Sequence, residues 1–319
     1  MDSELVSPKL IGEHSKVFAS GQEEELMNTI LKKAFRRSSV VVLLFCITTF
    51  AGDSVFSSFE FPGAKITMSG SITPDGKIAG DYVNPDGSQH GFLLIDGQFQ
   101  TIDVPGGTQT TVTWINPRGQ MVGNAIGSDG FSHGFLLSHG QFTTIDYPGA
   151  VATSAIGIGN NGDIVGIHTD TPGGRLRGFL LRKGTFSSID FPGAFFTIPT
   201  MTLMGRIVGG IFDNNFVPHG FVLSDGQFQQ IDCPGSISTF TSGIDVHGNL
   251  YGQFTGHDGI QHGTMVRDGN CIPIDFPGGT LSYADAATPD GDIVGRYTSS
   301  DGIVHGFLRT EQEWSSPLR

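Results

Sequence analysis

The chain has 319 residues, of which 47 are glycine, and only 15% of its residues are charged. This composition is typical of a turn-rich, all-β protein that is long enough to bury a sizeable core. The net charge is −13, and the region from residue 56 onward contains twice as many acidic as basic residues. Because phosphate binding needs a basic surface, the charge argues against nucleic acid as a partner.

Residues 1–53 differ in character from the rest of the chain. Residues 1–26 are polar and acidic, with no periodicity, and a basic segment follows at 32–37. An apolar run then covers 40–50. Basic and apolar blocks in this order are typical of a secretory signal. We therefore expect a leader over 1–53 with the signal at about 27–51, and a true start at Met27 would make the first 26 residues an extension.

Cleavage of this leader is expected between Ala51 and Ser54. The protein would then be secreted or held in the cell envelope, with no stable membrane span. A retained membrane anchor is the alternative, although the apolar run is short for a bilayer crossing of about 20 residues.

One motif recurs from Phe56 to the end of the chain every 42 to 44 residues. It begins Phe-x-x-Ile-Asp-x-Pro-Gly, continues through Ile-Val-Gly and closes on His-Gly-Phe-Leu-Leu. The copies begin at Phe56, Phe99, Phe142, Phe186, Phe228 and Cys271, and a truncated seventh begins at Trp314. A fixed period of this kind indicates a stacked or circular array, because one unit cannot bury its own apolar face.

Each copy is divided by three turn signals, such as Asp75-Gly76, Asp86-Gly87 and Asp96-Gly97 in the first. Such dipeptides favour tight hairpins, so each copy predicts a four-stranded antiparallel sheet. The Pro-Gly segment has no hairpin signal, and we expect the chain to cross there to the next sheet. Four strands per copy match a propeller blade. Residues 54–319 thus predict an all-β, six-bladed β-propeller.

The two ends of the repeat region complement each other. The strand 56–60 has no blade before it, whereas the last blade reaches its outer strand only at Trp314, just before Pro317. We expect the N-terminal strand to complete the last blade, which would remove two exposed sheet edges.

Cys46 lies in the leader, and Cys233 and Cys271 occupy different phases of the repeat. A disulfide needs Cα atoms within about 7 Å. The sequence does not indicate such proximity, and we expect two free, mostly buried thiols.

Histidine and a carboxylate recur in nearly every copy, a pattern that suggests acid–base or metal chemistry. Repetition argues against this, since a catalytic centre needs a single constellation. We therefore expect a structural contact made once per blade, with no catalytic residue, metal or cofactor. The recurrent positions are His90, His133, His219, His262 and His305, with Arg177 in the third full unit, and Asp103, Asp146, Asp190, Asp232 and Asp275, with Glu60 in the first copy.

The segments around His90, His133 and His219, together with Ile-Asp-x-Pro-Gly and Ile-Val-Gly, resemble the extracellular repeats called the HAF family after a His-Ala-Phe signature. The resemblance covers the whole repeat region, although this chain has glycine where the signature has alanine. It implies export and a repeat array, and it implies no activity.

Departures from the repeat are the better candidates for function. Propellers commonly bind at a loop-rich face or an axial mouth, where aromatic residues and arginine suit recognition. The least repeat-like residues of this type are Trp114, Arg175, Arg177, Phe195, Phe196, Phe216, His257 and Arg296.

We expect a monomeric, non-catalytic binding or scaffold module whose partner is an unknown protein or glycan. One alternative is a polysaccharide-active lyase or hydrolase with an axial site, for which Asp285 is the only acid predicted on an inner strand. The other is a lectin, which would need an exposed aromatic in each copy. Tyr82, His168, Phe254 and Tyr297 support the lectin alternative only in part, because Ala125 and Ile211 occupy the same phase.

Overall fold

The computed structural model describes residues 48–51 and 54–311, which form 25 β-strands and no helix. Accordingly, no helix of this described part is long and apolar enough to cross a membrane. The leader predicted at 1–53 lies outside the described residues, except for Thr48–Ala51, which form β1.

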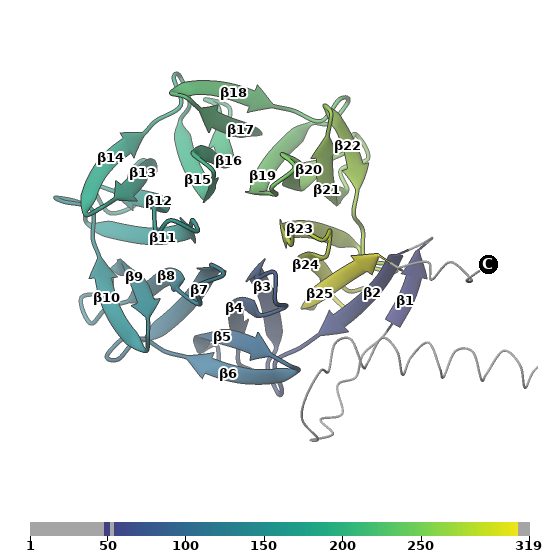
Figure 1. Ribbon diagram of the computed structural model, residues 1–319, viewed down its shortest axis with the longest axis horizontal. Helices are drawn as coiled ribbons and strands as arrows, with labels where there is room; N and C mark the ends of the chain where they lie inside the picture. The colour runs from purple at the N-terminus through teal and green to yellow at the C-terminus, as the bar shows by residue number, and fades with distance from the viewer. Residues whose placement is uncertain (1–47, 52–53, 312–319) are drawn as a thin grey trace, which may run out of the picture. The chain divides into compact units, whose positions relative to one another are not determined.

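Six antiparallel sheets are arranged around a central axis (Figure 1), as the sequence predicted. Blade 1 contains β3 (Ile66–Ile72), β4 (Ile78–Val83), β5 (Gln89–Ile95) and β6 (Gln98–Ile102). Blade 2 contains β7 (Gln109–Ile115), β8 (Met121–Ile126), β9 (Ser132–Ser138) and β10 (Gln141–Ile145). Blade 3 contains β11 (Ala152–Ile158), β12 (Ile164–Thr169), β13 (Arg177–Arg182) and β14 (Thr185–Ile189).

The second half repeats this pattern. Blade 4 contains β15 (Phe196–Leu203), β16 (Arg206–Phe212), β17 (Pro218–Ser224) and β18 (Gln227–Ile231). Blade 5 contains β19 (Ser238–Ile244), β20 (Leu250–Thr255), β21 (Gln261–Arg267) and β22 (Asn270–Pro273). Blade 6 contains β23 (Leu281–Ala287), β24 (Ile293–Thr298) and β25 (Val304–Glu311). In each blade the first strand lies nearest the axis.

The N-terminal strand completes the last blade, as predicted. β2 (Ser54–Phe59) pairs antiparallel with β25 from Ser54 opposite Glu311 to Phe59 opposite Gly306. β1 pairs in turn with β2, so blade 6 has five strands in the described chain. The Tyr297 hydroxyl donates to Ser58 Oγ over 3.1 Å, which ties β24 to the same strand. This pairing satisfies a strand edge of blade 6 that would otherwise be exposed.

Phenylalanine packs the interfaces between blades. The Phe of the His-Gly-Phe segment is almost fully buried in five blades, at Phe92, Phe135, Phe179, Phe221 and Phe307. Side chains alternate between the two faces of a strand, so this residue always points to the same side of its blade. Blade 5 has Thr264 in this position.

A second contact recurs between each Ile-Asp-x-Pro-Gly connection and the outer strand of the following blade. Phe61 and Phe99 make it at 5.1 Å between ring centroids, and Phe191 and Phe228 make it at 5.1 Å. The pairs Tyr147–Phe186 and Phe276–Phe56 repeat it, and Val104 packs in one cluster with Phe142.

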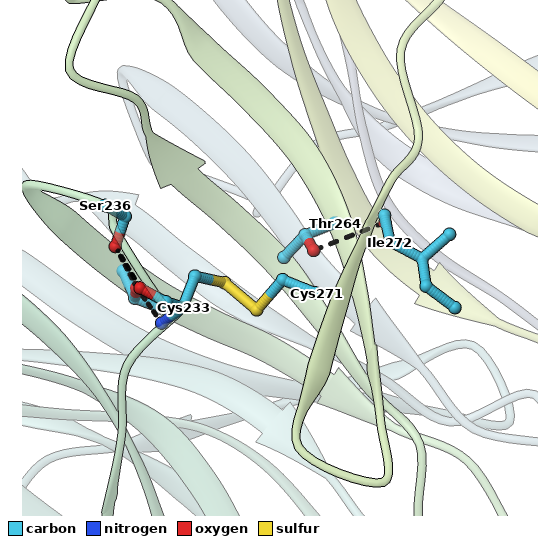
Figure 2. Close-up of a disulfide and its surroundings, with 6 residues drawn as sticks. Cys233, Ser236, Thr264, Cys271 and Ile272 are labelled. Carbon is cyan, nitrogen blue, oxygen red and sulfur yellow. Dashed lines mark hydrogen bonds between the residues drawn. A yellow bond between two sulfur atoms is a disulfide. The ribbon is translucent and has the colours of Figure 1, made fainter.

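Cys233 and Cys271 occupy this same pair of positions between blades 4 and 5 and form a disulfide with a Cα–Cα distance of 5.6 Å (Figure 2). The prediction of two free thiols was therefore wrong. The two cysteines occupy different positions in the repeat, one in the connection after blade 4 and one on the outer strand of blade 5. Each blade interface brings these two positions into contact.

Candidate functional site

The recurrent histidines each contact the carboxylate that follows the outer strand of their own blade. Each Nδ1 lies 2.7–3.0 Å from a carboxylate oxygen: His90–Asp103, His133–Asp146, His219–Asp232, His262–Asp275 and His305–Glu60. Arg177 stands in the histidine position of blade 3, where Asp190 is the corresponding acid. In the His133 pair both side chains are about a third or more exposed. The contact repeats around the ring, so no single pair stands apart as a reaction centre.

Aromatic stacking extends this contact in blades 1 and 6. Tyr82 lies parallel to Phe61 at 3.6 Å and stacks on His90 at 5.3 Å. Tyr297 makes the same two contacts with Phe276 and His305. Tyr82, His168 and Tyr297 are at most 6% exposed. They therefore do not form the exposed aromatic platforms that the lectin alternative needs.

Trp114 lies in the inner strand β7 and is buried. A Cβ atom added to Gly243, on the inner strand of blade 5, would lie 3.8 Å from Cη2 of the Trp114 ring. Since blades 2 and 5 are on opposite sides of the ring, the indole fills part of the axis. Trp114 is thus an axial packing residue rather than a loop residue.

Arg296 lies on β24, the second strand of blade 6, and its Nη1 is 3.0 Å from Oδ1 of Asp285 on the inner strand β23. Ser69 donates to the other oxygen of Asp285 over 2.9 Å, which links blades 1 and 6. Asp81 is close by and accepts a bond from Gln89 over 2.7 Å.

Burial raises the pKa of both Asp81 and Asp285 to about 6. The positive charge of Arg296 opposes the shift in both cases, and the charge of Asp285 adds to the shift at Asp81. In the sequence, Asp285 is the only acid expected on an inner strand. Asp81 lies on the second strand of blade 1, at the repeat position that Arg296 occupies in blade 6. Two residues of opposite charge at one repeat position were the sequence signal that could have identified Asp81.

Three of the predicted aromatic residues come together on the loops of blade 4. Phe216 lies 4.8 Å from Phe195 and 6.0 Å from Phe196 between ring centroids. Arg175 joins them from blade 3, since its Nη2 donates to the Ala194 carbonyl over 2.5 Å. We call Arg175, Phe195, Phe196 and Phe216 the blade 3–4 patch. Arg177 begins β13 and is exposed, and His257 is exposed on the corresponding loop of blade 5.

Phe216 has an unusual backbone conformation for its residue type. Its φ is +62°, and it is 57% exposed. The same turn position is glycine in four other blades, at Gly87, Gly130, Gly259 and Gly302, all with positive φ. Equivalent backbone bonds define the turn, for example from Gly87 N to Asn84 O and from Phe216 N to Asp213 O. A left-handed conformation costs a non-glycine residue about 1 kcal/mol or more.

No family model matches the chain, and no curated protein matches it. Among solved structures, the β-propeller domain of the Trilobed protease from Pyrococcus furiosus aligns over 88% of this chain and 100% of its own, with 10% identity and a TM-score of 0.51. A prolyl endopeptidase aligns over 95% of this chain and 56% of its own, with 12% identity and a TM-score of 0.50. A lectin from Aleuria aurantia aligns over 77% and 93%, with 10% identity and a TM-score of 0.49. At such identities the first two likenesses show the fold alone, a β-propeller, and the chain's own sheets make it a six-bladed one with tandem repeats.

Proposed function

We propose that the chain is an exported, non-catalytic binding module whose blade 3–4 patch contacts an acidic polysaccharide of the cell envelope or extracellular space. The observation that carries the proposal is Phe216. A large apolar side chain stands exposed at a turn position where four other blades have glycine. Neither burial nor backbone preference accounts for phenylalanine here, and conformational strain of this kind concentrates at binding and catalytic sites.

The chemistry of the patch suits a glycan that carries carboxylates. The rings of Phe195 and Phe216 offer apolar faces to sugar rings. Arg175 of the patch and Arg177, at the start of β13 outside it, offer planar guanidinium groups that pair with carboxylates. The overall acidic charge of the chain would repel such a polymer elsewhere, so these arginines would also direct its orientation.

Export is supported by the disulfide. Cys233–Cys271 joins two blades, and structural disulfides persist in oxidising compartments rather than in the cytosol. The HAF-like repeats and the leader expected at 1–53 agree with this location.

The sharpest test replaces Phe216 with glycine, the residue that the turn prefers. Phe216→Gly should leave the melting temperature equal or slightly higher, because it relieves the positive φ, and should weaken binding to polygalacturonate and alginate at least tenfold. His257→Ser, on the corresponding loop of blade 5, is the matched control and should bind like wild type. Binding can be measured by affinity electrophoresis or calorimetry.

Replacing Arg177 with serine should reduce binding to the charged polymers and leave any binding to neutral dextran unchanged. If wild type binds none of the polymers, or if Phe216→Gly binds them as tightly as wild type, the proposal is wrong. Tight binding to an envelope protein that Phe216→Gly abolishes would also overturn it, and would assign the patch to a protein partner.

A further inference from the structure

The interface between blades 4 and 5 has lost side-chain volume at three positions on one face of blade 5. Thr264 and Val266 are two residues apart on β21 and point to the same side, and Cys271 lies opposite Val266 on β22. At these positions the other blades carry Phe on the third strand, Leu two residues later (Arg309 in blade 6) and Phe on the outer strand, as in Phe92, Leu94 and Phe99 of blade 1. Figure 2 shows Thr264 beside the disulfide, with its hydroxyl bonded to the Ile272 carbonyl over 3.3 Å.

A groove of about 480 Å³ lies at this same interface. Its apolar floor comes from both blades: Val222, Ile231, Ile244, Leu250 and Val266. The volume is within the range of pockets that hold small organic ligands. The disulfide explains how the two blades can stay joined with less packing between them, because a covalent bond replaces the aromatic pair found at other interfaces.

Three polar groups on the rim have no hydrogen-bond partner among the described residues: the guanidinium of Arg206, the carboxylate of Asp268 and the amide of Gln229. The neighbouring Asp232 and Gln230 differ, because they bond to each other over 2.7 Å and Asp232 also holds His219. The rim thus offers one cation, one anion and one amide above an aliphatic floor.

We propose that this groove binds a short aliphatic peptide with free ends, of about two residues. Arg206 would pair with the terminal carboxylate, Asp268 with the terminal ammonium and Gln229 with the peptide bond, while the aliphatic side chains cover the floor. This site is independent of the blade 3–4 patch and does not rest on the function proposed for it.

The test is titration of the full chain with Leu-Leu, followed by calorimetry or by NMR. Arg206→Ser should weaken binding at least tenfold, and so should amidation of the peptide's C-terminus. Arg206→Ser combined with the amidated peptide should weaken binding no further than either change alone, because both remove the ion pair between Arg206 and the terminal carboxylate. Asp268→Asn and N-acetylation of the peptide should behave in the same way. Arg118→Ser, at the equivalent turn of blade 2, is the control and should bind like wild type.

A second variant fills the groove with the residues of the other blades. Thr264→Phe together with Val266→Leu should abolish Leu-Leu binding while keeping the circular dichroism of a folded chain. If that variant fails to fold, the two exposed rim variants decide the question. The proposal is overturned if Leu-Leu does not bind at millimolar concentration, if Arg206→Ser and Asp268→Asn bind like wild type, or if cellobiose occupies the groove with the same dependence on Arg206.

Discussion

Two blade interfaces are held together by different chemistry at equivalent positions. One lies between blades 6 and 1, and the other lies between blades 4 and 5. At the first, Phe59, Phe61, Phe92 and Phe99 make successive edge-on ring contacts between 5.1 and 6.4 Å. At the second, Thr264 and a disulfide stand in the places of three such aromatic positions, and a groove opens beside them. Apolar packing and a covalent link can therefore substitute for each other in this ring, and only the second leaves space.

The interface at blade 6 depends on β2, so removing that strand should have the largest effect. Deleting Ser54–Phe59 exposes the edge of β25 and removes the buried rings of Phe56 and Phe59. We expect loss of the closed monomer and association through the free edge, measured by light scattering. Phe59→Ala is a milder version and should cost about 3 to 4 kcal/mol of unfolding free energy. A deletion variant that stays monomeric with an unchanged melting temperature would show that the ring does not close through β2.

Removing the disulfide between blades 4 and 5 should lower the free energy of unfolding by less than removing β2 does. Replacing Cys233 and Cys271 with serine frees a loop whose ends are 38 residues apart, which corresponds to about 3 to 4 kcal/mol in the chain-entropy account. Denaturant unfolding measures this difference. Dithiothreitol should reproduce it in wild type and should have no effect on the double variant. Equal stability of the two proteins in the absence of reductant would mean that the packing of this interface suffices by itself.

The sequence predicted the six blades because glycine turns and alternating strands repeat at a fixed period. It also predicted that the N-terminal strand completes blade 6. The disulfide was missed, although Cys233 and Cys271 stand where other copies have a ring pair such as Phe191 and Phe228. Comparing contacts between copies, instead of residues within one copy, would have found it.

For the candidate residues, the repeat gives the phase of each residue but not the side of the blade to which its unusual side chain packs. Trp114 departs from the repeat and lies at the axis, and Arg296 departs from it and pairs with Asp285 of an inner strand. Phe195, Phe196 and Phe216 depart from it and form a loop patch. The groove between blades 4 and 5 lies where blade 5 has smaller residues than the other blades, and a search for conspicuous side chains does not detect such positions.

A substitution at Asp81, between blades 6 and 1, is expected to have a smaller effect and to stabilise the protein instead of destabilising it. The pKa of Asp81 is raised by burial to about 6, above its value of about 3.9 in the unfolded chain. The folded state therefore binds more protons between about pH 4 and pH 6, and stability from this group falls as the pH rises through that window. Asp81→Asn should stabilise the protein by about 1 to 3 kcal/mol at pH 7. The amide oxygen still accepts the bond from Gln89, and the gain should vanish near pH 4. A gain that is the same at both pH values would contradict this assignment.

The smallest effects concern two histidines that have opposite environments. Hydrogen bonds to Asp146 and then to Asp129 raise the pKa of His133, whereas burial lowers the pKa of His168, which is stacked on Tyr147 at 3.7 Å. The stabilising pair of His133 is thus fully present below the unfolded pKa of about 6.5 and is lost as the pH rises through the folded pKa. Buried, neutral His168 has the opposite effect: the stability of the folded chain falls as the pH drops below about 6.5, because the unfolded chain then binds the proton more readily than the folded chain does.

The variants His133→Ala and His168→Phe separate these two signs. His133→Ala should cost less than about 1 kcal/mol, since the pair is partly exposed, and the cost should be larger at pH 5.5 than at pH 8. His168→Phe keeps an aromatic ring beside Tyr147, and blade 5 already has Phe254 at the same phase. This variant should gain stability relative to wild type at pH 5.5 but not at pH 8. Melting temperatures at the two pH values measure both changes. If the two variants shift in the same direction between pH 8 and pH 5.5, the recurrent histidines and His168 do not differ in the way that their surroundings indicate.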